Sequence, residues 1–183
     1  MAARGPDNES PRPGLKPLAA PRRMGRMFAL SLKQPWATLL AHGLKTVEVR
    51  RWPTARRERI LIHAARVPDE RPEAWARVPP EVLPAARLLG GIIGVGDLTG
   101  CVAYRHLDAF AADKAHHLNE LSWFEEPALY GFVFANLEVL PFRRYPGWMR
   151  FFAVTDGLPA RLREERAAPD ELPTGTGQGR PSL

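Results

Sequence analysis

The chain has 183 residues, 45% of them hydrophobic, which is enough for one folded domain with flanking tails. Its formal net charge is +6. The single cysteine excludes a disulfide framework and a zinc site built from cysteines. No apolar run reaches the length of a membrane span, and the N-terminus lacks the apolar core of a signal peptide. We therefore expect a cytoplasmic protein without a membrane partner.

Composition divides the chain into a core and two tails. Residues 1–26 and 159–183 are rich in Pro, Gly and Arg and have no apolar period, so we predict that both are disordered and that 27–158 forms one domain. Residues 31–66 contain eight Lys or Arg and two acids, a charge of +6 against −4 for the rest of the core. Such polarity indicates a positive face or groove, although a solvated basic face is the simpler alternative.

The first half of the core alternates strands and turns. Residues 28–32 alternate large apolar and small residues and predict a strand. A helix is expected over 35–42, because Pro35 suits a first helical turn and Gly43 suits a left-handed stop. A strand over 46–52 follows, with Glu48 and Arg50 on one face.

The second half is richer in strands. Glycines recur through the β-rich stretch 90–104 and suggest a bent strand, while Asn136 suggests a bulge in a strand over 130–142. The fold class we predict is α+β, a small β-barrel of about six strands with short flanking helices. The remaining expected elements are strands over 60–65 and 147–154 and helices over 73–77, 81–89 and 109–121.

Lys45, Glu48 and Arg50 form the most informative charged group. On a strand, Glu48 and Arg50 share a face, and Lys45 stands at the strand entrance. These residues can form a simple ion pair worth a fraction of a kcal/mol. In a cleft, the same glutamate can accept a hydrogen bond from a ligand amino group or act as a general base. The sequence alone leaves both interpretations open.

Aromatic and basic residues nearby are suited to nucleic acid. Trp36 or Trp52 could stack on a base, with core packing as the alternative for each. Four cations could hold phosphates, and a solvated surface is the alternative for them. They are Lys33, Arg56, Arg57 and Arg59.

Other motifs give no site. The glycines of 91–96 are not followed by a helix, so they do not predict a phosphate cradle. His106, His116 and His117 fix no ligand set and indicate a surface helix, so we predict neither a metal nor a cofactor. Cys101 lies in an apolar run and is expected to be a small buried hydrophobe.

Several segments in order resemble the ASCH domain family, named for homology to the activating signal cointegrator-1 protein. They are LSLKQPWA, GLKTVEVRRWPT, RILIHAA, GGIIGVGDLTGCV and YGFVFANLEVLPF, within residues 28–155. The resemblance implies a PUA-like β-barrel, a helix beside a cleft, and RNA or nucleotide-like ligands. The ligand-binding residues expected in that cleft are Gln34, Trp36, Lys45, Glu48, Arg50, Trp52 and His63.

One small bacterial branch of the family hydrolyses N4-acetylcytidine with a Lys, a Thr and a Glu. Lys45 falls on the lysine of that branch, but Glu48 stands where the branch has its threonine. Because the hydroxyl is missing there, we favour a nucleic-acid or modified-nucleoside binding module, with transcription or translation control as its expected setting. The alternatives are an amidohydrolase or ribonuclease with Lys45 and Glu48 as catalytic residues, and a protein-interaction module.

Overall fold

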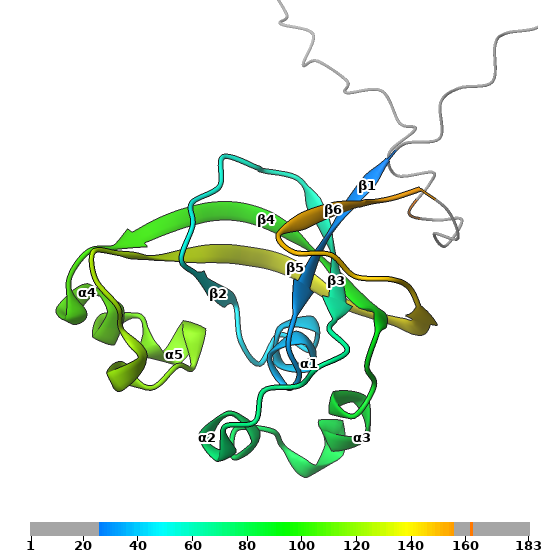
Figure 1. The fold of residues 1–183 in the computed structure, drawn as a ribbon, viewed down its shortest axis with the longest axis horizontal. Coiled ribbons are helices and arrows are strands. Elements are labelled where there is room, and N and C mark those ends of the chain that lie inside the picture. Colours follow the sequence, from blue (N-terminus) through cyan, green and yellow to red (C-terminus); the bar gives the residue numbers. More distant parts are fainter. Residues whose placement is uncertain (1–25, 156–161, 163–183) are drawn as a thin grey trace, which may run out of the picture.

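A computed structural model describes residues 26–155 and residue 162 of the chain. Six strands form one mixed sheet in the order β2-β5-β4-β3-β1-β6, with short helices beside it (Figure 1). β1 pairs with β3 in parallel, and all other neighbours are antiparallel. The strands span Met27–Leu32 (β1), Val47–Arg50 (β2), Arg59–Ala64 (β3), Gly91–Tyr104 (β4), Leu129–Arg144 (β5) and Phe151–Val154 (β6).

The helices are short and gather below the sheet in the view of Figure 1. The helix expected over 109–121 is divided at Asp113 into two short helices, and Leu118, with a left-handed φ of 61°, ends the second of them. The helices are Trp36–Ala41 (α1), Pro72–Trp75 (α2), Leu83–Ala86 (α3), Leu107–Ala112 (α4) and Lys114–His117 (α5), with 3-10 turns at Pro80–Val82 and Leu121–Trp123.

The two longest strands, β4 and β5, bend together at a bulge. Asn136 has a φ of 48°, and the pairing register shifts between Val95 and Asp97 on the facing strand. The side-chain amide of Asn136 donates to Asp97 Oδ2 over 2.7 Å. An extra residue in one strand of an antiparallel pair bends it and increases its twist. The predicted irregularity at Asn136 is therefore confirmed.

The sheet curls without closing. β2 and β6 lie at its two ends, and no backbone ladder joins them within residues 26–155. Side chains bridge the gap instead: the Trp52 ring contacts Phe132 at 4.9 Å and Phe151 at 5.4 Å, both edge-on. Arg50 Nη2 also donates to the Ser31 carbonyl over 2.7 Å. The α+β class and six strands with short helices are confirmed, while backbone hydrogen bonds among the described residues do not close the predicted β-barrel.

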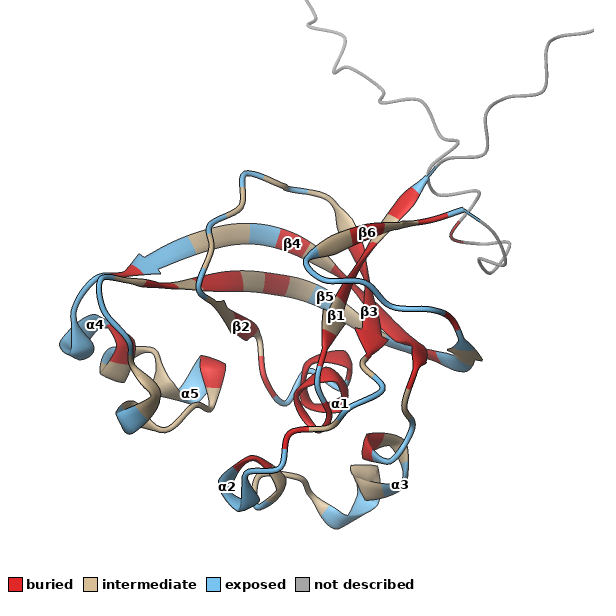
Figure 2. Cartoon of the chain, in the orientation of Figure 1, coloured by how far each residue is buried: buried red, intermediate tan, exposed pale blue. Residues whose placement is uncertain are grey.

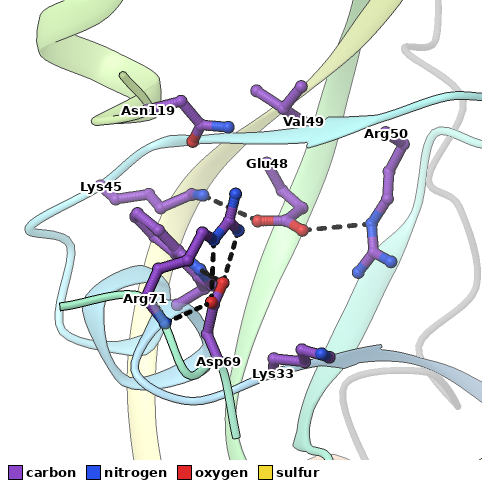
Figure 3. A pocket seen from close by; sticks show the side chains of 9 residues that line it. Lys33, Lys45, Glu48, Val49, Arg50, Asp69, Arg71 and Asn119 are labelled. Carbon is purple, nitrogen blue, oxygen red and sulfur yellow. Dashed lines mark hydrogen bonds and ion pairs between the residues drawn. The ribbon is translucent and has the colours of Figure 1, made fainter. Parts of the chain in front are cut away.

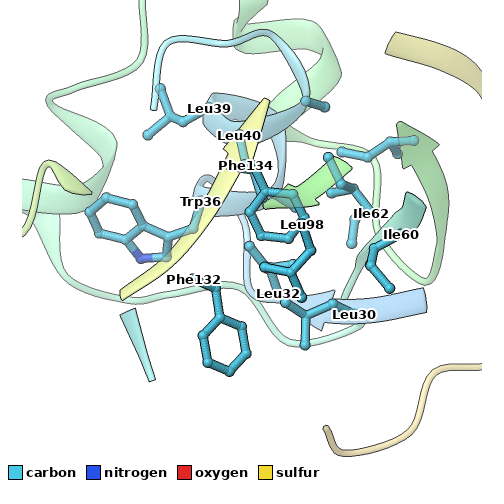
Figure 4. Packing of buried hydrophobic residues seen from close by; sticks show 14 of the residues in the cluster. Leu30, Leu32, Trp36, Leu39, Leu40, Ile60, Ile62, Leu98, Phe132 and Phe134 are labelled. Carbon is cyan, nitrogen blue, oxygen red and sulfur yellow. The ribbon is translucent and has the colours of Figure 1, made fainter. Parts of the chain in front are cut away.

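Each face of the sheet carries a cluster of buried side chains. Alternate residues of β1 point to opposite sides, so Leu30 and Leu32 join the cluster under α1 while Met27 and Ala29 join a second cluster. Figure 2 shows the buried positions along α1 and the central strands. The α1 side chains meet the aromatic and branched residues of the sheet (Figure 4). The labelled members are Leu30, Leu32, Trp36, Leu39, Leu40, Ile60, Ile62, Leu98, Phe132 and Phe134.

Close packing fixes α1 in place. A Cβ on Gly94 would lie 2.7 Å from Ala41 Cβ, so only glycine lets the helix approach β4 this closely. Gln34 Oε1 accepts from the Thr38 N–H over 3.0 Å, which satisfies one free donor of the first turn. Gly43, with a φ of 70°, ends the helix as predicted.

The predicted tails lie outside the described residues, apart from Arg26 and Leu162. Leu162 is buried in the second cluster with Met27 and Val154. Contacts with the sheet therefore continue past the domain boundary that we expected at residue 158.

Candidate functional site

A cavity of about 180 Å³ lies between α1 and β2, and we call it the α1–β2 cavity (Figure 3). The turn between the two elements is short, and its backbone is fixed because the Lys45 N–H donates to the Leu39 carbonyl over 3.1 Å. This bond directs Lys45 into the cavity just before β2 begins. The lining residues are Lys33, Trp36, Lys45, Glu48, Val49, Arg50, Asp69, Arg71 and Asn119.

Glu48 lies between two cations. Lys45 Nζ is 2.8 Å from Glu48 Oε2, and Arg50 Nε is 3.1 Å from Oε1. The Arg50 contact is an ion pair without hydrogen-bond direction, because the Nε atom has no aligned acceptor among the described residues. The Lys45 side chain is 2% exposed and that of Glu48 9%, so this pair is largely removed from water. Burial lowers the pKa of Lys45, while Glu48 opposes that shift.

Trp36 and Asp69 form the opposite wall. The indole Nε1–H donates to Asp69 Oδ2 over 2.8 Å, and Arg71 donates to the same carboxylate through Nε and its backbone N–H. The Arg71 hydrogen bonds, with smaller help from Trp36, hold the pKa of Asp69 well below its usual range. The Arg71 guanidinium lies 3.7 Å from the Trp123 ring centre, and Trp123 meets Trp36 edge-on at 6.0 Å. This carboxylate fixes the orientation of the Trp36 ring, and its own oxygens are fully occupied.

The cavity combines a planar aromatic wall with several hydrogen-bonding groups. Lys45 Nζ lies 4.6 Å from the Trp36 ring centre and has donors beyond the one directed at Glu48. Asn119 adds an amide with both a donor and an acceptor. Four cations and two acids line the cavity, a formal excess of positive charge. A flat heterocycle with amino and carbonyl groups matches these walls.

A second hollow of about 380 Å³ adjoins the α1–β2 cavity and shares Val49, Arg50, Arg71 and Asn119 with it. Trp52, Trp123 and Glu125 belong to its wall. Trp52 thus lies beside the site, although its ring packs on Phe132 and Phe151 as described above. A ligand in the α1–β2 cavity can therefore extend beyond it.

Two predicted ligand residues lie elsewhere. Gln34 is fully buried, and its amide nitrogen donates to the carbonyls of Ala85 and Leu88, so it joins α1 to α3. His63 is also buried, and it lines a separate cavity. The structure thus brings together Trp36, Lys45, Glu48 and Arg50, but not Gln34 or His63.

The basic turn of residues 56–59 does not line the α1–β2 cavity. Arg56 pairs with Glu58 and stacks on Phe28 with 3.7 Å between guanidinium and ring centre. Arg59 pairs with Asp97 and Glu138 at 3.1 and 3.3 Å. Arg57 is exposed and donates to backbone carbonyls of the turn. Lys33, the fourth cation of the predicted phosphate set, does line the cavity.

Sequence reasoning missed Asp69, Arg71 and Asn119. They follow β3 and α5, far along the chain from the Lys45 motif, and no local pattern marks them. The surface helix expected at His117 is wrong for this residue, because its ring is buried and stacked on Phe110. Its Nδ1 accepts from the Asn119 N–H over 3.0 Å, so a histidine two residues earlier is the one local pointer to Asn119. Burial lowers the pKa of His117, which favours the neutral ring that this bond requires.

The fold and cavity define a small α+β domain with a curled mixed sheet and a charged, aromatic site beside its first helix. The model of the ASCH domain family matches residues 30–146, more than half of the chain, and the chain belongs to this family. A search of curated proteins gave no match.

The solved structures that resemble this chain include the ASCH protein of Zymomonas mobilis. It is 15% identical, with a TM-score of 0.51, over 80% of this chain and 94% of that one. A Tyr-to-Phe variant of the same protein is also 15% identical, with a TM-score of 0.52 over 80% of this chain and 96% of that one. A Ser-to-Ala variant is 15% identical, with a TM-score of 0.52 over 81% of this chain and 96% of that one. At this identity the likeness supports the fold alone.

In the part of the chain that the structure describes, every helix is too short to span a lipid bilayer. No group of three or more His, Cys, Asp or Glu side chains is arranged to hold a metal ion there.

Proposed function

We propose that this chain is a PUA-like RNA-binding module whose α1–β2 cavity receives one nucleobase or modified nucleoside. The observation that carries the proposal is the buried Lys45–Glu48 pair beside the Trp36 ring in a hollow of about 180 Å³. Ligand pockets for drug-sized molecules are larger, about 300–1,000 Å³. The small hollow fits a single ring system better than a long ligand.

Each wall has a role in this proposal. The Trp36 indole supplies a flat surface for the base, and Lys45 and Glu48 supply a donor and an acceptor for its edge. Asp69 and Arg71 hold Trp36 in place. The exposed cations Lys33 and Arg71 attract the backbone of the RNA strand, and the nucleotide on one side of the bound base lies in the adjoining hollow.

A catalytic alternative rests on the same pair. A lysine with a lowered pKa beside a carboxylate can transfer protons, and the resemblance to the N4-acetylcytidine hydrolases places Lys45 on their lysine. The Thr46 hydroxyl does not substitute for the missing threonine, since it lies 3.2 Å from His116 Nδ1 and lines none of the described cavities. We therefore favour binding.

Affinity measurements test the proposal. Calorimetric titration of the wild type with the four ribonucleosides, N4-acetylcytidine and short single-stranded RNAs should give saturable binding. Lys45→Ala and Glu48→Gln should each weaken it by about 1.5–3 kcal/mol, the range for a hydrogen bond to a charged group. Arg105→Ala, at an exposed position outside these cavities, is the matched control and should not change the affinity.

The same samples separate binding from catalysis. We expect N4-acetylcytidine to be recovered intact after incubation with the wild type. Deacetylation or RNA cleavage that disappears in Lys45→Ala would replace the binding module with an enzyme. No binding of any nucleoside or RNA would overturn the proposal and favour a protein-interaction module.

A further inference from the structure

A larger cavity, of about 540 Å³, lies on the other side of Lys33 from the α1–β2 cavity. We call it the loop cavity, because the segment between β5 and β6 forms one of its walls. This segment runs back past β3 toward β1 (Figure 1), where Gly147 packs against His63. The lining residues used below are Lys33, His63, Arg66, Val67, Trp148 and Met149.

His63 makes a fixed floor for the loop cavity. Its Nε2–H donates to the Tyr145 carbonyl over 2.9 Å, and its Nδ1 accepts from the Ser31 hydroxyl over 3.0 Å. A Cβ on Gly147 would lie 2.3 Å from His63 Cε1, so only glycine lets the loop pass this close to the ring. These contacts set the position of the next residue, Trp148.

Trp148 and Met149 are 55% and 91% exposed, although both are large and apolar. The Trp148 ring rests on Phe152 at 5.4 Å between ring centres, which supports it from beneath. An exposed indole held in this way offers a face on which a flat ring can stack. Val67, 60% exposed, extends the apolar surface.

The charges around the loop cavity have one sign. Lys33 and Arg66 are exposed cations in its wall, and no acidic side chain of the described residues lines it. An exposed aromatic ring beside unopposed cations is the combination that binds a base and its phosphate in single-stranded nucleic acid. The α1–β2 cavity differs, because two acids lie among its cations.

We propose that the loop cavity binds the nucleotide adjoining the one in the α1–β2 cavity, in the same RNA strand, with its base on Trp148. This inference rests on the proposed function. Lys33 lines both cavities, so its ammonium stands where the phosphate linking the two nucleotides would pass. The RNA strand then passes Lys33, just beyond the end of β1, and Arg66 contacts the next phosphate.

Ligands of two lengths test the two-site path. The long probes are four RNA hexamers, each built from one of the four nucleotides repeated six times. The short probes are the four matching nucleosides, which cannot reach both cavities. Trp148→Ala should weaken the best hexamer by about five- to a hundredfold, the loss of one stacked base, and leave the best nucleoside unchanged. Trp148→Phe should keep most of the affinity.

Controls separate stacking from folding. Trp148→Leu retains an apolar contact for Phe152 but no flat ring, so it should bind the hexamer as weakly as Trp148→Ala while unfolding at the wild-type temperature. Phe142→Ala removes another exposed aromatic ring, outside the cavities, and should leave both affinities unchanged. Lys33→Ala should reduce the slope of log hexamer affinity against log salt concentration by about 0.7, the value for one phosphate contact with a single strand.

The outcomes are distinguishable. If the wild type binds the hexamer and Trp148→Leu binds it with the same affinity, the loop-cavity assignment is overturned and the proposed function stays intact. An equal loss for nucleoside and hexamer would also overturn it, because the base in the first cavity would then depend on Trp148. Absence of wild-type binding to every probe would remove the proposed function itself.

Discussion

The basic turn of residues 56–59 and the α1–β2 cavity contain similar charges but use them differently. In the turn, Arg56 and Arg59 are partly exposed and are paired with acids of their own surface. In the cavity, Lys45 and Glu48 are withdrawn from water and border an open space. Charge density along the chain therefore does not locate a binding site. Burial of charge around a hollow is a stronger sign of one.

The largest expected effect concerns the buried pair. Glu48→Ala leaves Lys45 without its carboxylate, and removing one partner of a buried pair costs about 3–5 kcal/mol in the free energy of unfolding. Glu125→Ala is the surface control: it breaks the Arg51–Glu125 pair, whose side chains are 75% and 49% exposed, and should cost about 0–1 kcal/mol. Urea titration of both variants measures the difference.

A double variant sharpens this result. Lys45→Met combined with Glu48→Leu removes both charges and keeps comparable volume, so it should recover most of the lost stability. It should nonetheless bind no nucleoside, because the edge-recognising groups are gone. Equal costs for Glu48→Ala and Glu125→Ala would contradict the contrast between cavity and surface.

A smaller effect is expected at Asp69. Asp69→Asn weakens the bonds from Trp36 and Arg71, so near neutral pH it should lower the free energy of unfolding by about 1.5–3 kcal/mol. Because the folded-state pKa of Asp69 is lowered, its contribution is complete above the ordinary value of 3.8 and is lost as the pH falls toward the lowered value. Urea unfolding between acid and neutral pH should show the two proteins converging in acid. A constant difference would assign the effect to packing.

The smallest effect concerns the basic turn. Arg57 is exposed, and its bonds within the described part of the chain go to backbone carbonyls, so it retains its charge for a phosphate. Arg57→Ala should lower the slope of log affinity against log salt by about 0.7, the value for one single-strand contact. Arg59→Ala, at a position already paired with Asp97 and Glu138, should leave the slope unchanged. An equal change for Arg59→Ala would contradict the expectation that pairing with Asp97 and Glu138 withholds its charge from phosphate.

Local patterns were enough to predict most of the fold. Alternation located β1 and β2, Gly43 marked the end of α1, and Asn136 marked the bulge, because each depends on backbone conformation within a few residues. The end of α5 at Leu118 was not predictable in this way, since a left-handed leucine carries no local signal. Local patterns also could not show that backbone hydrogen bonds leave the predicted barrel open, because closure depends on whether distant strands pair by backbone or by side chains.

Strand spacing was sufficient to place Glu48 and Arg50 on one face with Lys45 at the strand entrance, and the structure brings the three charges together. Long-range packing was needed to show that Asp69, Arg71 and Asn119 complete the cavity and that Gln34 lies outside it. Asp69 reaches Trp36 across 33 residues, and Asn119 is positioned by His117 of another helix. Such contacts arise from packing between remote segments, and the order of residues along the chain does not encode them locally.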